Sequence, residues 1–355
     1  MEAICLDSRG ETAAVATSWN PKIANASVLA VGMVVGIHTA GREIGVFENG
    51  CAMWWWLALG MYGIFQTAVP FFFICSGYFL AGHMNEKGWY GCECHKRVWS
   101  LLTPYLLWSV LYAALQSAAV FGVNLSHGQL SFMDMGVRSW IHTFGISPFE
   151  YPRLCPLWYV RTLMIFVILS PLLEKVVKAT CGLWYIVILF LLSIVFEVYH
   201  LPQPIDFVLA KSFSLFGLFF FVSGMYLRLK PIPLPEWSGF ALLGGLCVVL
   251  GNACLWSWLG MSFFSRTLCS VLLIWGLWKF IPERPFPKWL TNSTFAVFLM
   301  HPFVFYLWDC ISIRPVETIP MWLLKWVVGF GGSVVVAHAL RRFWPAMAKI
   351  AFGRR

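Results

Sequence analysis

The sequence predicts an all-α polytopic membrane protein in which about ten transmembrane helices form one bundle. The chain has 355 residues, of which 59% are apolar and only 12% are charged, against roughly 25% charged residues in soluble domains. Its 20 Trp and 31 Phe residues are more than one water-soluble core of this size can cover, so much of the apolar surface must face lipid. This composition excludes a soluble enzyme and a disordered chain.

Ten apolar stretches are long enough to cross a bilayer, since a spanning helix needs about 20 mostly apolar residues whose backbone groups bond within the segment. These predicted spans are 23–41, 64–82, 98–122, 157–174, 182–198, 207–227, 237–256, 263–281, 289–309 and 321–340. They divide the chain into a cytoplasmic segment 1–22, a transmembrane domain 23–345 and a basic tail 346–355.

The distribution of Lys and Arg predicts the orientation. With the N-terminus in the cytoplasm, 17 of the 25 Lys and Arg residues fall on the cytoplasmic side, as the positive-inside rule requires. We therefore expect a multi-pass protein of the cell's inner membrane with both termini in the cytoplasm. The net charge of +9 is explained by this topology, and no basic stripe or aromatic pattern indicates a nucleic-acid partner.

Two histidines stand out because titratable groups at membrane depth are costly and ask for a reason. His38 lies near the outer end of the first predicted span, and His301 lies past the middle of the ninth. A structural interpretation of His38, as a helix histidine bonded to a neighbour, stays open. Four basic residues begin spans from the outer side and share this layer, namely Arg161, Lys211, Arg266 and Lys325. For Lys325 the simpler interpretation is a side chain that reaches from a helix end toward water.

This layer has a composition suited to acid–base chemistry. Imidazole has an unperturbed pKa of about 6.5, so a buried neutral histidine can take the proton of a hydroxyl. Arg161, Lys211, Arg266 and His301 are candidates for binding the substrate or a developing oxyanion. Carboxylates are sparse there, with Glu197 and Asp309 both at outer ends of spans.

A second candidate site lies on the predicted cytoplasmic side. Ser76 is followed by Gly77, and small residues at this point allow a close approach between backbones. Lys96 and Arg97 precede the third span, and Tyr105 follows in its first turns. Basic groups beside an aromatic ring are suited to the phosphates and base of a nucleotide-containing donor. The positive-inside rule alone also explains a Lys-Arg pair at this point.

We expect no metal site. Residues 92–95 read Cys-Glu-Cys-His, but a zinc site of this type needs a second pair of ligands, which the neighbouring sequence lacks.

Taken in order, several segments resemble the acyltransferase-3 family of integral membrane O-acyltransferases. The first-span segment ending at His38 is similar to that family's first-span histidine, and Phe-Phe-Phe-Ile-Cys-Ser-Gly-Tyr within 70–80 is similar to its second-span signature. The further resembling segments are 96–105, 156–161 and 293–302. The resemblance implies transfer of an acyl group, most often acetyl from acetyl-CoA, to a hydroxyl of a cell-envelope glycan or lipid-linked sugar. It also implies that CoA binds from the cytoplasm and that His38 acts as the base.

The chain departs from the family pattern at two positions. Ser27 and Ser100 stand where many members carry arginines, so we expect Lys22 or Lys96 to take their part in holding a donor. A transporter or flippase for an anionic or glycan-linked substrate is the alternative function, although the paired repeats typical of transporters are not evident. A family member that acts as a sensor or assembly partner is a third hypothesis.

Overall fold

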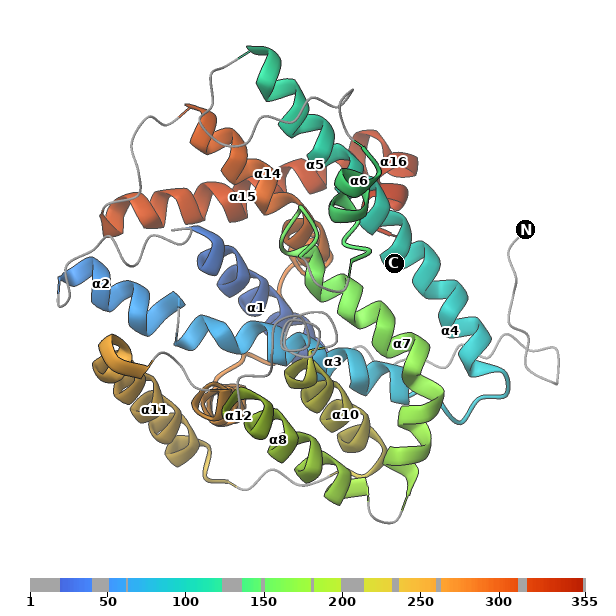
Figure 1. Ribbon diagram of the computed structural model, residues 1–355, viewed down its shortest axis with the longest axis vertical. Helices are drawn as coiled ribbons and strands as arrows, with labels where there is room; N and C mark the ends of the chain where they lie inside the picture. Colours follow the sequence, from blue (N-terminus) through green and yellow to red (C-terminus); the bar gives the residue numbers. More distant parts are fainter. Residues whose placement is uncertain are drawn as a thin grey trace.

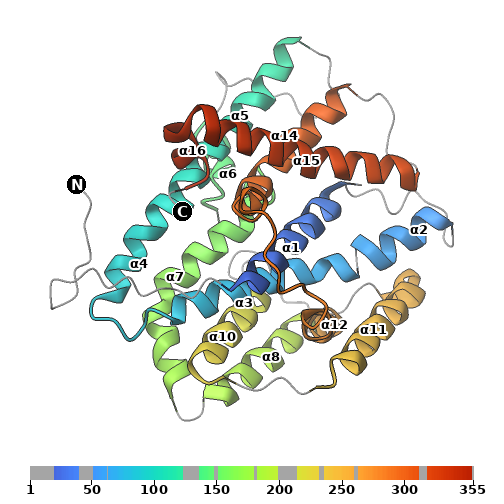
Figure 2. The same ribbon diagram turned by 180° about the vertical axis from the view of Figure 1, so that it is seen from behind.

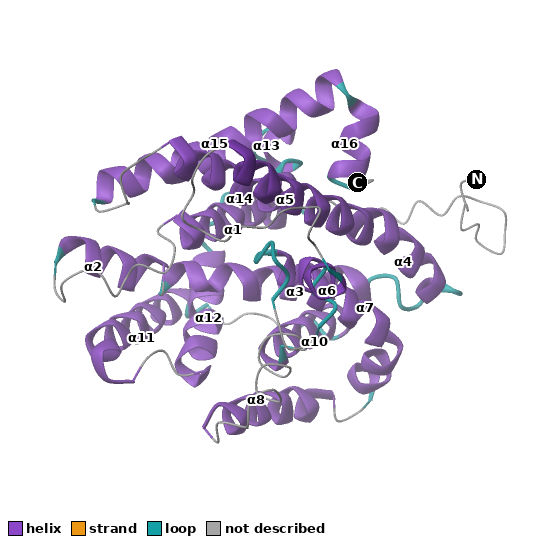
Figure 3. Ribbon diagram, turned by 45° about the horizontal axis from the view of Figure 1, so that its top comes forward, coloured by secondary structure: helices purple, strands orange, loops and turns teal. Residues whose placement is uncertain are grey.

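The computed structural model contains helices and no strands in the part of the chain that it describes (Figure 3). The described residues are 20–39, 51–61, 63–122, 136–147, 151–179, 182–198, 214–231, 236–259, 263–311 and 318–353. The all-α fold class predicted from the sequence is thereby confirmed.

Each of the ten predicted spans overlaps a helix, and most helix ends lie within a few residues of the predicted ones. The predicted span 207–227 begins outside the described residues. Nine of the helices carry most of the bundle: α1 (Pro21–Thr39), α3 (Ala68–Ala81), α5 (Thr103–Gly122), α7 (Leu157–Lys178), α8 (Gly182–Val198), α10 (Leu215–Leu229), α11 (Ser238–Leu259), α12 (Phe263–Trp278) and α14 (Thr294–Ile311). The long α15 (Ile319–Phe343) follows, and five short helices complete the description: α2 (Ala52–Trp56), α4 (Trp89–Arg97), α6 (Val137–Thr143), α13 (Lys288–Thr291) and α16 (Pro345–Ala351).

Several helices have the length and composition of membrane spans. Four helical stretches are long and apolar enough to cross a bilayer, at 21–39, 52–81, 89–116 and 319–343, and five shorter apolar helices accompany them within the described residues. The outward side chains fit this reading, because α8 exposes Leu183, Trp184 and Leu191, which only lipid would cover favourably. The chain is a polytopic membrane protein.

Two spans are longer than the sequence predicted. A π-helical turn, η4 (Val98–Leu102), joins α4 to α5, so the helix begins at Trp89. Helix α2 runs directly into η2 (Leu57–Met61), and η3 (Ile64–Thr67) runs directly into α3; residue 62, between η2 and η3, lies outside the described residues. The aromatic run 54–56 lies in helix α2, and Trp56 packs against Trp322 with ring centres 5.4 Å apart.

Helix α1 occupies the centre of the bundle (Figures 1 and 2). It contacts α3 on one side and α14 and α15 on the other. The indole of Trp326 on α15 donates a hydrogen bond to the carbonyl of Gly32 (2.8 Å), which fixes the two helices side by side. We name the two ends of the bundle by the residues of α1 that lie there, the Lys22 end and the His38 end.

Helices α3 and α10 make a very close contact. A Cβ added at Gly77 would lie 2.0 Å from the carbonyl oxygen of Phe221, and one added at Gly224 would lie 2.0 Å from that of Ile74. The absence of a side chain at both positions is therefore what lets the two backbones touch. The close approach predicted for Gly77 is confirmed, and it holds the neighbouring Ser76 in place.

Candidate active site

Two histidines from distant parts of the sequence meet inside the bundle. His38 lies in the last turn of α1 and His301 lies in α14, and their ring centres are 5.2 Å apart with the planes tilted by 35°. His301 is 0% exposed, whereas His38 is half-buried. The sequence placed both residues in one layer, and the structure brings them into contact.

The His301 ring is held by its own helix. Its Nδ1 lies 3.1 Å from the carbonyl oxygen of Val297, one turn earlier in α14. A carbonyl can only accept a hydrogen bond, so Nδ1 carries the proton and donates it. In the neutral ring Nε2 then has a free lone pair, and this atom is buried without a hydrogen-bond partner among the described residues.

Aromatic rings surround the pair along α14. Phe305 packs edge-on against His301 (5.9 Å between centres), and Phe298 lies 6.3 Å from it on the other side. Phe298 in turn contacts the ring of Tyr159 at 5.8 Å. These rings pack against the buried His301 imidazole, and a dry environment strengthens any hydrogen bond formed there.

Ser76 is connected to the same aromatic group. Its hydroxyl lies 3.2 Å from the Tyr159 hydroxyl, and the Tyr159 ring packs against Phe73 at 4.8 Å. The second-span motif and the segment that opens α7 therefore meet at Tyr159, a residue that the sequence analysis did not single out. Its position inside the Pro-Leu-Trp-Tyr-Val-Arg segment 156–161 was the available signal.

Lys325 has a partner that explains its burial. Its Nζ lies 2.6 Å from a carboxylate oxygen of Asp309 and 5.3 Å over the ring of Phe305. The side chain of Lys325 is 9% exposed and that of Asp309 is 63% exposed. Lys325 thus forms an ion pair next to the Phe305 ring that covers His301, rather than reaching into water alone.

Arg161 binds the turn that follows α6. Its guanidinium donates to the carbonyl oxygens of Gly145 (2.8 Å) and Ser147 (3.3 Å), and the residue is only 9% exposed. Tyr105 is 4% exposed and donates to the carbonyl of Phe144 (2.6 Å). Arg161 and Tyr105 therefore hold the same turn after α6, although the sequence assigned them to opposite sides of the membrane.

The remaining predicted donor residues lie on α4. Arg97 forms an ion pair with Glu93, one turn earlier in the same helix, with Nε 2.6 Å from the carboxylate. Glu93 is 2% exposed, so the pair is anchored, while Lys96 is exposed. The structure thus places Lys96 and Arg97 together, and it places Ser76 and Tyr105 with other partners.

The other two predicted substrate-binding residues are Arg266 and Lys211. Arg266 is half-buried on α12, and Lys211 lies outside the described residues.

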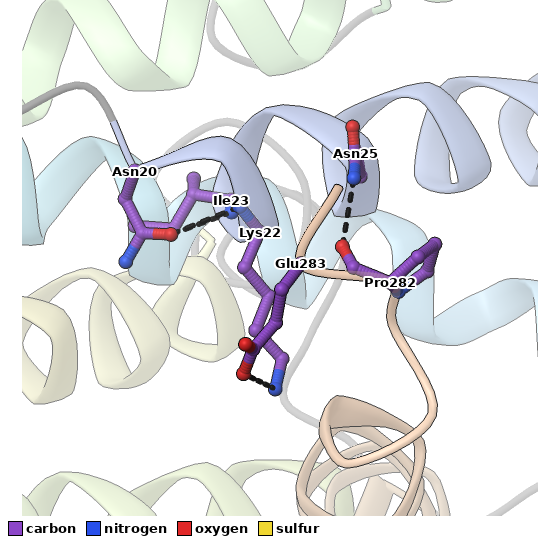
Figure 4. Close-up of polar contacts among 6 residues, drawn as sticks. All are labelled: Asn20, Lys22, Ile23, Asn25, Pro282 and Glu283. Carbon is purple, nitrogen blue, oxygen red and sulfur yellow. Dashed lines mark hydrogen bonds and ion pairs between the residues drawn. The ribbon is translucent and has the colours of Figure 1, made fainter. Parts of the chain in front are cut away.

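At the Lys22 end, α1 is fixed by a buried amide (Figure 4). The side-chain nitrogen of Asn25 donates to the carbonyl oxygens of Pro282 (2.7 Å) and Arg284 (2.8 Å), and its oxygen accepts from the N–H of Phe286 (2.8 Å). Asn25 is 0% exposed, so one side chain ties the loop between α12 and α13 to α1. Asn25 was not predicted from the sequence, where an amide in an apolar span was the available signal.

Lys22 lies beside this loop. Its ammonium is 3.8 Å from a carboxylate oxygen of Glu283 and 5.4 Å from the ring centre of Trp278. Among the residues described, no group of three or more His, Cys, Asp or Glu side chains is arranged to hold a metal ion.

The chain is similar to known proteins over most of its length. A family model described as an acyltransferase domain, of the acyltransferase-3 type, matches residues 26–342. The succinoglycan biosynthesis protein ExoH of Rhizobium meliloti (strain 1021) is 23% identical over 353 residues, an alignment that covers 92% of this chain and 90% of that protein. No solved structure matches the chain.

Proposed function

The chain belongs to the acyltransferase-3 family, whose domain spans most of its length, and from this premise we propose that it moves an acyl group from acyl-CoA to a hydroxyl of a cell-envelope carbohydrate or lipid-linked sugar. We propose acetyl-CoA as the donor and His38 as the general base. The protein then works in the inner membrane with both termini in the cytoplasm.

The observation that carries this proposal is the contact between His38 and His301 inside membrane helices. Imidazole is the side chain best suited to take a proton from a hydroxyl near neutral pH, and a buried pair of imidazoles is costly unless it has a use. The similar protein of Rhizobium meliloti is a succinoglycan biosynthesis protein, which supports a glycan as the acceptor.

In the proposed reaction, His38 takes the proton of the acceptor hydroxyl as the oxygen attacks the thioester carbonyl. The carbon–sulfur bond then breaks, and the proton passes from His38 to the leaving thiolate, so that the products are an ester and free CoA. A positioned general base contributes about 10²- to 10⁴-fold to such a rate. We keep as a prediction that the acceptor is bound by Arg161, Lys211 and Arg266.

On the donor side we propose that CoA binds at the Lys22 end, which then faces the cytoplasm. Lys96 is exposed and Arg97 is fixed by Glu93, so both present positive charge near the start of α5. Lys22 provides a further cation at the beginning of α1. Such groups suit the phosphates of a nucleotide-containing donor.

Comparison of cells with and without the gene tests the acceptor. Mass spectrometry of the envelope glycans should show acyl esters that disappear on deletion and return with the full chain, but not with His38→Ala. Ester content unaffected by deletion would overturn the proposed function.

An assay with purified protein separates this function from a transporter. Detergent-solubilised protein should release free CoA thiol from acetyl-CoA when supplied with glycan extracted from the deletion strain. A transporter that binds the same glycan releases no thiol.

A further inference from the structure

The buried lone pair on His301 needs an explanation, because nearly all buried polar atoms have a hydrogen-bond partner. The bond between Nδ1 and the Val297 carbonyl fixes which nitrogen carries the proton. The other nitrogen, Nε2, is therefore an acceptor, held in place by the helix and left without a donor among the described residues. Nε2 can therefore accept a hydrogen bond from an N–H or O–H group.

His38 is placed to supply that donor. Two imidazole rings joined by a hydrogen bond of about 2.9 Å between their nitrogens have centres about 5.2 Å apart, and the centres of His38 and His301 are 5.2 Å apart. The distance between the ring centres therefore equals the one that such a bond requires. The half-buried state of His38 leaves it freer to turn than His301, which is 0% exposed.

We propose that His301 is a positioning residue that orients the catalytic base by accepting a hydrogen bond from the His38 ring. This inference rests on the proposed function and deepens it. With one N–H of the His38 ring donated to His301, the other nitrogen keeps its lone pair and faces the acceptor hydroxyl. When that nitrogen takes the proton, the resulting imidazolium keeps its bond to Nε2 of His301 and is stabilised by it.

The surroundings explain why an imidazole performs this task instead of a carboxylate. The rings of Phe298 and Phe305 flank His301, and an ionised carboxylate among such groups would be strongly destabilised. Asp309 is already bound to Lys325, with 2.6 Å between carboxylate oxygen and ammonium. A neutral acceptor avoids that cost and still selects one tautomer of His38.

Two substitutions of His301 distinguish positioning from packing. In His301→Gln the side-chain oxygen reaches about as far as Nε2 and can accept the bond, whereas in His301→Asn the polar group stops near the position of Nδ1. We expect kcat to fall less than about 10-fold in the Gln variant and about 100-fold or more in the Asn variant. KM for acetyl-CoA should stay within about 2-fold in both. The assay measures thiol release from acetyl-CoA with glycan extracted from the deletion strain.

The outcomes are distinguishable. If the wild type is active and His38→Ala is not, but the Gln and Asn variants of His301 lose activity equally or keep it equally, the positioning role is wrong and the proposed function stands. If the wild type releases no thiol, both are wrong.

A measurement on the wild-type chain covers the case in which a His301 variant does not fold. With histidine labelled by ¹⁵N and the protein in lipid nanodiscs, a scalar coupling between ring nitrogens should appear, and it should vanish in His38→Ala. Absence of that coupling in active wild-type protein overturns the inference.

Discussion

The buried polar side chains at the two ends of α1 differ in their hydrogen bonding. At the Lys22 end the Asn25 amide is 0% exposed and makes three hydrogen bonds to backbone groups of a single loop. At the His38 end α1 meets His301, which is equally buried but keeps one nitrogen without a partner among the described residues. The Asn25 amide therefore has its hydrogen-bond partners within the fold. Nε2 of His301 gains a partner only when a donor group moves next to it.

This difference separates a structural group from a functional one. A buried donor or acceptor without a partner lowers the stability of the fold by about 1–3 kcal/mol. Native proteins break such local rules mainly where function requires it. The contrast predicts that substitutions at the His38 end change catalysis more than stability, and that substitutions at the Lys22 end do the reverse.

The largest effect is expected for His38→Ala. Loss of the general base should lower the rate of ester formation by at least about 100-fold, while the melting temperature in detergent stays within a few degrees of the wild type. His338→Ala is the matched control, because His338 is exposed on α15 and should leave the rate unchanged. Equal losses in the two variants, or retained activity in His38→Ala, would remove the proposed base.

The opposite behaviour is expected for Asn25→Leu. Three backbone groups of the loop after α12 lose their partner, which should lower the free energy of unfolding by about 2–4 kcal/mol. The molecules that stay folded should release CoA thiol at close to the wild-type kcat. Ser27→Ala is the matched control on the same helix. The Ser27 hydroxyl donates to the Ile23 carbonyl of its own helix (2.8 Å), so the loss of this hydroxyl should change the unfolding energy by less than about 1 kcal/mol.

The sequence predicted the groups that stand out by their depth. His38 and His301 could be found because titratable residues inside apolar runs are rare, and their helices follow from length and composition. Asn25 could not be assigned its role in this way, because its partners are backbone groups more than 250 residues away. The sequence pattern shows where a polar group is buried, but not which segment folds against it.

Tyr105 illustrates the same limit. The sequence placed it beside Arg97 at the start of a span, and that neighbourhood suggested donor binding. In the structure the turn after α6 folds against α5, and both Tyr105 and Arg161 bond to its carbonyl groups. Contacts across loops depend on tertiary packing, which neither hydropathy nor charge counts describe.

An intermediate effect is expected for Lys325→Met. The Lys325 ammonium stands between the exposed Asp309 and the Phe305 ring that packs on His301. A pair with one exposed partner contributes about 1 kcal/mol, so the unfolding energy should fall by no more than that. The rate should fall about 2- to 5-fold, which is the size of effect that an indirect contact through one ring produces.

Asp309→Asn separates charge from packing at this ion pair. It keeps the Lys325 side chain over the Phe305 ring and removes the carboxylate. If the ring contact is what matters for His301, this variant should keep nearly the wild-type rate. A loss of activity as large as that of His38→Ala in either variant would instead place the ion pair in the reaction itself.

The smallest effect, and the sharpest for the Lys22 end, is expected for Lys22→Gln compared with Glu283→Gln. The two side chains are 3.8 Å apart and that of Glu283 is 86% exposed, so breaking the pair from either side should change the unfolding energy by less than about 1 kcal/mol. The variants differ in the positive charge at position 22, because only Lys22→Gln removes a cation that a donor phosphate can bind. We therefore expect KM for acetyl-CoA to rise about 3- to 10-fold in Lys22→Gln and to stay unchanged in Glu283→Gln, with kcat unchanged in both. An equal KM in the two variants would mean that Lys22 serves the Asn25 loop alone, and the Lys22 end would then be structural throughout.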